Sequence, residues 1–240
     1  MKSISMGLLM FCITFFSFCQ SNSDKNENNF QKQNRTVEDF TGIKVENAIS
    51  LVLTQGNSNS VSVSTSNSQD QKRVITEVEN GILNVKLESG IWSWKNRKII
   101  VHVSMQSIAS IEASGASDIK ITNKLLSEDL KIKLTGASSL KGEIKCLKLN
   151  VGLSGASSIK LNGIGGEVNI KATGASSCKG YDFNCENAKI EASGASEINI
   201  SVNKSLFAKA SGASSINYKG NPSVKEIKSS GASSIKQKQD

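Results

Sequence analysis

ASGASDIKI, at residues 113–121, contains a glycine-alanine-serine triplet that occurs seven times in this chain of 240 residues. The seven glycines are Gly115, Gly136, Gly155, Gly174, Gly194, Gly212 and Gly231. Successive glycines are separated by 21, 19, 19, 20, 18 and 19 residues. A nearly constant period is typical of a solenoid, because loops on one side vary in length while the stacked strands keep their register.

Apolar and polar residues alternate on both sides of each triplet. Two, four and six positions before Gly136 stand Leu134, Ile132 and Leu130, with charged residues between them. Four positions after the glycines stand Ile119, Leu140, Ile159, Cys178, Ile198, Ile216 and Ile235. A period of two indicates β-strands with one buried face. We therefore predict an all-β fold, a single-domain parallel β-helix (β-solenoid) with about 19 residues per coil, right-handed as parallel crossovers nearly always are.

The triplet itself is interpreted as a structural turn. Glycine adopts the positive φ of a sharp corner without a steric penalty. The alanine is the same in all seven coils, so we expect its methyl group to fill a tight interior corner. Serine or threonine brackets the Gly-Ala pair, and stacked hydroxyls can bond along the column and to the turn backbone. These roles need no ligand.

The first 19 residues have the pattern of a signal peptide. Lys2 supplies a positive start, and residues 7–18 supply an apolar segment that is shorter than a membrane-spanning helix. Cleavage before Gln20 is the first interpretation, and lipidation of Cys19 is the alternative. Either predicts an exported protein, in the periplasm, on the outer-membrane surface or outside the cell.

The rest of the chain is predicted to be a tether and one β-rich body. Residues 20–37 are polar and rich in asparagine, which favours disorder. Residues 38–240 form the solenoid, with opening coils and a cap in 38–110 and the seven triplet coils in 111–236. At most one short helix is expected, around residues 68–76.

The charge and the cysteines limit the functional classes. The formal net charge is +8, but the basic residues are scattered along the strands, so no nucleic-acid footprint is evident. Cys146, Cys178 and Cys185 follow the signal, and an odd number cannot pair completely. Cys146 and Cys185 share a column two coils apart, about 9.6 Å by strand spacing, which exceeds disulfide reach. We predict three free thiols and no zinc site.

No set of residues resembles a catalytic centre. His102 is the only histidine, and its neighbours offer no nucleophile. Many β-helix enzymes cleave polysaccharides with clustered carboxylates. Here Glu112 and Glu191 share a column but stand four coils apart, and Asp118 is alone. We predict that the protein is not an enzyme and has no cofactor or metal.

Two sets of residues are candidates for ligand binding. Lys120, Lys141, Lys160 and Lys179 occupy equivalent positions in consecutive coils. Such a stripe could bind an anionic glycan or lipopolysaccharide, or it could be a solvated strand face that discourages unwanted sheet pairing. Trp92 and Trp94, beside basic residues, could stack on sugars or could fill the N-terminal core.

The repeated corners carry a family resemblance. SGAS corners about 19 residues apart, preceded by FTGIKVENAISLVLTQGNSNSVSVSTS and followed by NYKGNPSVKEIKSSGASSI, resemble the bacterial auto-transporter adhesin head, or GIN domain, family. The resemblance covers roughly residues 38–236, with Cys178 in a column that otherwise holds Ile or Leu. It implies a β-helical, secreted or surface-associated protein and provides no catalytic residues.

Three functional hypotheses follow. The first is a non-enzymatic solenoid of the cell envelope or surface that binds a glycan or another cell-surface partner. The second is a carbohydrate-active β-helix enzyme, and the third is an envelope-stress accessory that binds a partner protein. Contact with a membrane is expected only through a lipid anchor at Cys19. The sequence favours the first hypothesis, because the carboxylates do not converge.

Overall fold

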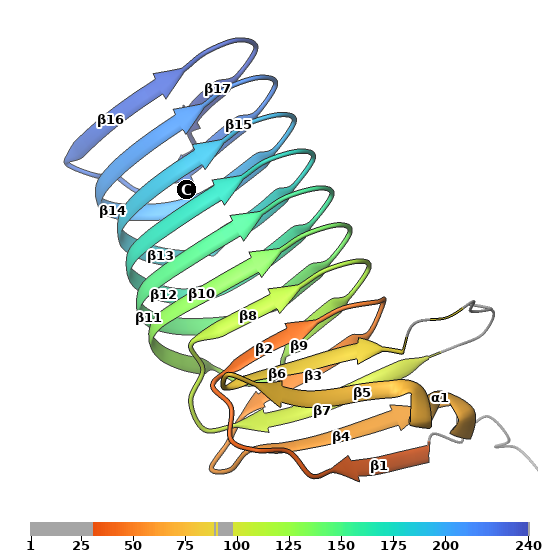
Figure 1. The fold of residues 1–240 in the computed structure, drawn as a ribbon. Helices are drawn as coiled ribbons and strands as arrows, with labels where there is room; N and C mark the ends of the chain where they lie inside the picture. The colour runs from red at the N-terminus through yellow and green to blue at the C-terminus, as the bar shows by residue number, and fades with distance from the viewer. Residues whose placement is uncertain (1–30, 89, 91–97, 240) are drawn as a thin grey trace, which may run out of the picture.

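The chain winds into a stack of parallel β coils that rises from one capped end (Figure 1). This computed structural model describes residues 31–88, 90 and 98–239. The described strands join into one continuous sheet, and the predicted β-solenoid with about 19 residues per turn is confirmed. The signal peptide, Cys19, Trp92 and Trp94 lie outside the described residues.

The triplet region forms the upper coils of Figure 1. Its strands are β8 (Ser110–Ala113), β9 (Asp118–Ile121), β10 (Leu125–Leu134), β11 (Ser139–Leu153), β12 (Ser158–Ala172), β13 (Ser177–Ala192), β14 (Glu197–Ala210), β15 (Ser215–Lys219), β16 (Val224–Ser229) and β17 (Ser234–Gln237). Neighbouring coils pair in parallel and in register, so that Leu134 lies beside both Ala113 and Leu153. Strands β11 to β14 each run from one corner to the next, so the return segment is itself a strand.

A single apolar core runs through the stack. The residues predicted to point inward before and after the corners are buried, from Ile119 to Ile216, whereas Ile235 in the last coil is only partly buried. Phe183 is fully buried, and its ring occupies the space that a side chain at Gly165 would need. Burial of apolar surface supplies the main favourable contribution to folding.

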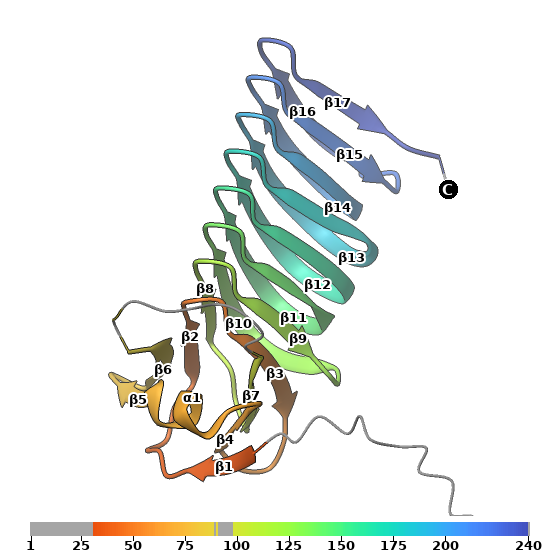
Figure 2. The ribbon, with the colours of Figure 1, turned by 90° about the vertical axis from the view of Figure 1, so that its right-hand side faces the viewer.

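The corners stack along one edge of the solenoid, as Figure 2 shows. All seven triplet glycines have φ between 71° and 76°. A β-carbon on Gly155 would lie 2.7 Å from the carbonyl oxygen of Gly136 in the coil below, and the Ala156 amide donates a hydrogen bond of 2.8 Å to that same oxygen. Glycine is therefore required both by its conformation and by the close approach of the next corner.

The prediction for the alanine is wrong. The triplet alanines, such as Ala195, are exposed, whereas the serine that follows is buried in the first six corners. The Ser196 hydroxyl donates hydrogen bonds of 2.9 Å to the carbonyl of Ser193 and 3.2 Å to the carbonyl of Ala172. The small interior position of the corner thus belongs to serine. Its hydroxyl donates to the Ser193 carbonyl across the turn and is a second donor to the Ala172 carbonyl, which also accepts from the Ser193 amide.

The opening coils do not follow the order of the chain. Strand β2 (Gly42–Val45) pairs in parallel with both β6 (Ile82–Leu87) and β8. Likewise β3 (Ser50–Gln55) lies between β7 (Ile99–Met105) and β9. The coil made by β2 and β3 is therefore inserted between a later coil, β6 and β7, and the first triplet coil.

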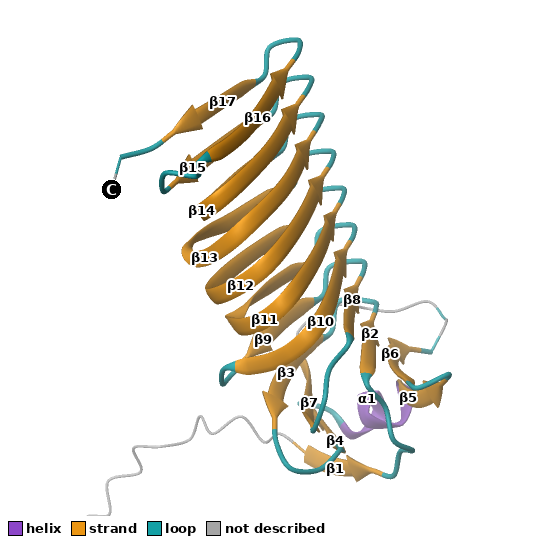
Figure 3. Cartoon of the chain, turned by 90° about the vertical axis from the view of Figure 1, so that its left-hand side faces the viewer, coloured by secondary structure: helices purple, strands orange, loops and turns teal. Residues whose placement is uncertain are grey.

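Antiparallel strands close the lower end of the stack (Figure 3). Strand β5 (Val74–Glu79) covers the edge of β6, and β4 (Ser60–Thr65) covers the edge of β7. The helix α1 (Ser68–Arg73), capped by the Asn67 side chain, confirms the one short helix expected near residues 68–76. Strand β1 (Gln31–Arg35) pairs with β4, so the prediction of a disordered tether is wrong for these five residues.

Candidate ligand-binding faces

The four predicted lysines form a column on the strands that follow the corners. Lys120 on β9, Lys141 on β11, Lys160 on β12 and Lys179 on β13 are direct neighbours in the parallel register. At the strand spacing of about 4.8 Å, four coils span about 14 Å. All four side chains are exposed. We call these four residues the lysine column.

A column of hydroxyls runs beside the lysine column. The residues two positions before each lysine are Asp118, Ser139, Ser158 and Ser177, which are also direct register neighbours. The Ser139 hydroxyl donates a hydrogen bond to the Asp118 carboxylate. Ser139, Ser158 and Ser177, which we call the serine column, therefore place hydroxyl groups along the same outward face as the ammonium groups.

The lysine column has no acidic partners within the described residues. None of its four side chains forms an ion pair with any residue that the structure describes. Above it the column continues as Asn199 and Asn217, joined by a 3.0 Å hydrogen bond between their side chains. Below it the register leads through Val52 to His102. Burial lowers the pKa of the His102 imidazole, and the nearby Lys32 ammonium lowers it further.

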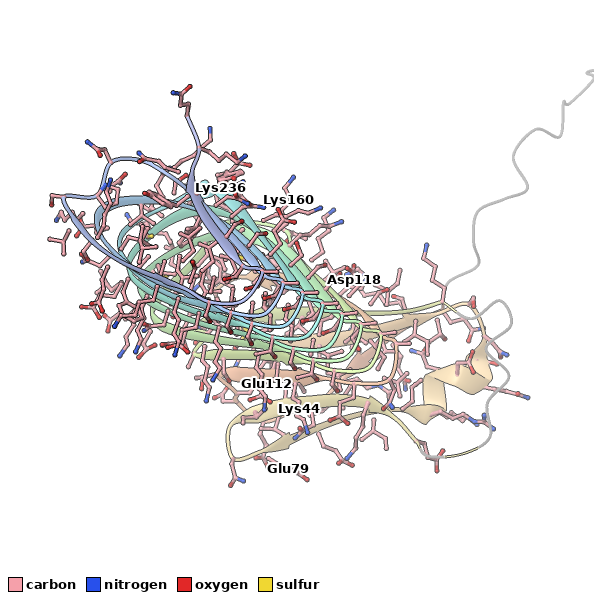
Figure 4. All side chains as sticks on the ribbon, turned by 90° about the horizontal axis from the view of Figure 1, so that it is seen from above. Lys44, Glu79, Glu112, Asp118, Lys160 and Lys236 are labelled. Carbon is pink, nitrogen blue, oxygen red and sulfur yellow. The ribbon has the colours of Figure 1, made fainter. Side chains whose placement is uncertain are left out.

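The strands before the corners present a second face on the opposite side of the solenoid. Seen along the stack in Figure 4, Lys160 and Lys236 lie on one side, and Glu112 and Lys44 lie on the other. Outward from β8 to β13 on this second face the register runs Glu112, Lys133, Gly152, Lys171 and Glu191. Glu112 and Glu191 are therefore four coils apart, as the sequence predicts.

An apolar groove lies on the return strands. Leu126, Leu147 and Ile164 are 52%, 69% and 49% exposed, although their side chains are apolar. They line a groove with a volume of about 930 Å³, together with Cys146 and Cys185 at its base. Sequence reasoning missed this groove, because it treated the return segments as variable loops and did not assign their faces.

The three predicted free thiols are confirmed, and all are buried. Cys146 and Cys185 both lie beside Gly165 in the register, so they are two coils apart as predicted. Burial raises the pKa of the Cys146 thiol to about 11 and of the Cys178 and Cys185 thiols to about 12. A thiol that stays protonated is a poor nucleophile and a poor metal ligand.

No cluster of three or more histidine, cysteine, aspartate or glutamate side chains suited to a metal ion occurs in residues 31–88, 90 and 98–239. His102 is exposed between Val101 and Val103, as expected. In the described part of the chain no helix has the length and apolar character needed to cross a membrane.

The comparisons with known proteins concern the fold. No curated protein matches the chain. One similar solved structure is a "putative adhesin" from Bacteroides fragilis. It is 20% identical, with a TM-score of 0.81, and the match covers 87% of this chain and 96% of the other. Another is a "putative adhesin" from Parabacteroides merdae, which is 18% identical, with a TM-score of 0.67 and coverage of 88% of this chain and 96% of the other.

A third solved structure has a different printed name. It is a "putative lipid binding protein" from Parabacteroides distasonis, 18% identical, with a TM-score of 0.69 over 89% of this chain and 98% of the other. Identities this low establish a shared fold alone. The family model, in contrast, matches residues 39–222, most of the solenoid. The chain therefore belongs to the family described as "Putative auto-transporter adhesin, head GIN domain".

Proposed function

We propose that this protein is an exported, non-enzymatic β-solenoid that binds anionic glycans at a cell surface through the lysine column. The observation that carries the proposal is the in-register run of Lys120, Lys141, Lys160 and Lys179 without acidic partners in the described residues. Like charges at about 4.8 Å repel each other, so an anionic polymer on this face would relieve the repulsion.

The neighbouring serine column supports the same ligand class. Its hydroxyls can donate to or accept from sugar hydroxyls, while the ammonium groups contact carboxylates or sulfates. A rigid parallel sheet also holds both columns at one repeat distance, which suits a ligand that is itself a repeating polymer. The adhesin names of the family and of the similar structures agree with a surface-binding role.

The spread of the carboxylates supports a non-enzymatic role. Polysaccharide hydrolysis needs two carboxylates within roughly 10 Å of each other across one sugar. Glu112 and Glu191 are separated by four coils, about 19 Å at the strand spacing. Asp129 and Glu167 are only two coils apart, but Lys148 stands between them in the column. Asp118 accepts a hydrogen bond from Ser139 and has no second carboxylate in its own column until Glu197, four coils away.

Binding to immobilised polysaccharides tests the proposal. The full chain is passed over a polyuronate, a sulfated glycan and an uncharged glucan at several salt concentrations. We expect binding to the two acidic polymers that weakens as salt rises, and no binding to the glucan. A folded protein that binds none of them would overturn the proposal, and selective capture of a single envelope protein instead would favour the partner-protein alternative.

The apolar groove favours a second candidate function, binding of an acyl chain. Leu126, Leu147 and Ile164 lie exposed on consecutive coils around a groove large enough for a small ligand. One similar structure is named as a lipid-binding protein. Displacement of a fluorescent fatty acid tests this candidate: Leu147→Gln is expected to weaken binding several-fold, and equal binding by both proteins would count against it.

A further inference from the structure

Gly152 interrupts a column of long side chains on the second face. It lies between Lys133 and Lys171 in the parallel register, and the next residue in the column is Glu191. The other described members of this column, from Glu112 to Lys228, all carry charged side chains. One position in the middle of the face is therefore empty of side-chain atoms.

The backbone does not require glycine at this position. A β-carbon on Gly152 would find only the Ile132 carbonyl oxygen, 4.0 Å away, and its φ is not in the left-handed region. At Gly155, three residues later, a β-carbon would lie 2.7 Å from the next corner. Glycine within a strand also weakens the strand. The absence of a side chain at Gly152 thus has no structural explanation in its surroundings.

A depression with a volume of about 620 Å³ includes this position. Its outward-pointing side chains are Lys131, Lys133, Asn150, Asn169, Lys171, Lys189 and Glu191. We call this the Gly152 depression. Asn150 and Asn169 line it in a hydrogen-bonded ladder, in which Asn169 donates to Asn150 at 3.1 Å and Asn150 donates to Asp129 at 3.2 Å.

The rim of the depression is strongly basic. Four lysines and one glutamate line it, and none of the four lysines forms an ion pair within the described residues. Lys133 and Lys171 flank Gly152 one coil below and one coil above, about 9.6 Å apart at the backbone. Their flexible side chains can both reach a group that sits over Gly152. The Lys189 ammonium lies 5.8 Å from the centre of the Phe207 ring.

From this geometry we propose that the Gly152 depression is a binding site for one carboxylated sugar residue of an acidic saccharide. The sugar ring lies over Gly152, where a side chain would exclude it. Its carboxylate is held by Lys133 and Lys171, and its hydroxyls are within reach of the amide groups of Asn150 and Asn169. This site is separate from the lysine column, because it lies on the opposite side of the solenoid.

The test uses a ligand that is too short to reach around the solenoid. Trigalacturonate is titrated into the full chain and into Gly152→Lys, with maltotriose as the uncharged control. Gly152→Lys fills the depression and at the same time adds one positive charge. A site that depends on the depression predicts at least tenfold weaker binding, whereas attraction by charge alone predicts tighter binding. Unchanged or tighter binding by Gly152→Lys would overturn the proposal, as would a wild-type protein that does not bind trigalacturonate.

Two further variants separate the site from its surroundings. Gly152→Thr fills the depression without adding charge. We expect this variant also to bind trigalacturonate at least tenfold more weakly, with a melting temperature no lower than that of the wild type. Lys141→Gln/Lys160→Gln alters only the lysine column and is expected to bind trigalacturonate within twofold of the wild type. Loss of trigalacturonate binding in the second variant alone would assign the ligand to the lysine column and overturn the assignment to Gly152.

Discussion

At the scale of single residues, the corner motif depends on glycine and on its second serine for different reasons. The glycine combines a positive φ with a close approach to the corner below, and the buried serine hydroxyl satisfies carbonyls of two coils. The alanine between them is exposed. Conservation of a residue type among the seven corners therefore does not by itself show that the residue is buried.

Two glycine substitutions separate conformation from crowding. Gly81 has φ 74° and no atom within 4 Å of its β-carbon position, whereas Gly155 has φ 73° and an oxygen at 2.7 Å. We expect Gly81→Ala to lower the free energy of unfolding by about 1 kcal/mol, the cost of the left-handed conformation, and Gly155→Ala to lower it by about 3 kcal/mol. Urea denaturation measures both, and equal losses would contradict the role of crowding.

The reversed roles of alanine and serine give a second prediction. Ser196→Ala removes a buried hydroxyl and leaves the Ala172 carbonyl without that donor, so we expect a loss of about 1 kcal/mol. Ala195→Ser changes an exposed methyl group and is expected to alter stability by less than about 0.5 kcal/mol. Thermal unfolding of the two variants checks the prediction, which a larger loss in Ala195→Ser would contradict.

At the scale of elements, the coil of β2 and β3 turns without a glycine. Asn47 and Ala48 have φ of 65° and 59°, and the Asn47 amide lies under the Gly115 corner, 3.3 Å from its β-carbon position. The two residues therefore occupy the place of a triplet corner. Alanine is strained in this conformation, whereas asparagine tolerates it better.

Replacement of this alanine is expected to stabilise the coil. Ala48 is exposed, so Ala48→Gly removes little packing and relieves a conformation that costs about 1 kcal/mol. We expect a higher midpoint of urea denaturation, with Ala116→Gly at an ordinary corner as the control that lowers it. A lower midpoint for Ala48→Gly would show that the corner is not strained.

The same coil shows what the sequence can and cannot predict. The period of 19 residues, the inward columns and the lysine column follow from regular spacing, and the structure places them as predicted. The insertion of β2 and β3 between two later coils leaves no trace in local periodicity, because strand pairing is set by long-range contacts. Strand β1 was missed for the same reason, since its polar sequence is held by pairing with β4.

The candidate sites also differ in whether the sequence could predict them. Regular spacing predicted the lysine column, but the Gly152 depression arises from a side chain that is absent, and its neighbours come from four strands. The sequence analysis did not assign faces to the return strands, where bulges shift the register between β12, β13 and β14. Of the exposed side chains of the apolar groove, Ile164 lies on β12 in this region, whereas Leu126 and Leu147 lie on β10 and β11.

At the scale of the whole molecule, the stack is held by one continuous core and closed at its lower end by antiparallel strands. At the upper end every residue of β16 is exposed, and the apolar Val224 and Ile227 are 63% and 44% exposed. Terminal coils of solenoids open more easily than central ones, since each coil contacts only its neighbours.

The buried thiols report on opening of the central coils. The pKa of Cys178 is raised from 9.0 to about 12 by burial, so the folded state keeps its proton where the unfolded chain loses it. The stability that the buried, protonated Cys178 thiol contributes is therefore present below pH 9.0 and is lost as the pH rises toward about 12, because ionisation then favours the unfolded chain. We expect the stability of the wild type to fall over this range more steeply than that of Cys178→Val, as measured by urea denaturation at each pH. An equal fall in the stability of the wild type and of Cys178→Val with rising pH would contradict this prediction.

Binding of an acidic polysaccharide by a variant of the lysine column tests whether the outward lysines bind the ligand while the Gly-Ala-Ser corners stabilise the fold. Lys141→Gln/Lys160→Gln removes two charges from the lysine column. The control, Lys148→Gln/Lys204→Gln, removes two from the return strands, where Lys148 adjoins Asp129 and Glu167 and Lys204 pairs with Glu186. With unchanged melting temperatures, we predict at least tenfold weaker binding of a sulfated glycan that carries no carboxylates, and therefore no ligand for the Gly152 depression, by the column variant, and a change within twofold for the control. Equal affinities of the two variants would contradict the account.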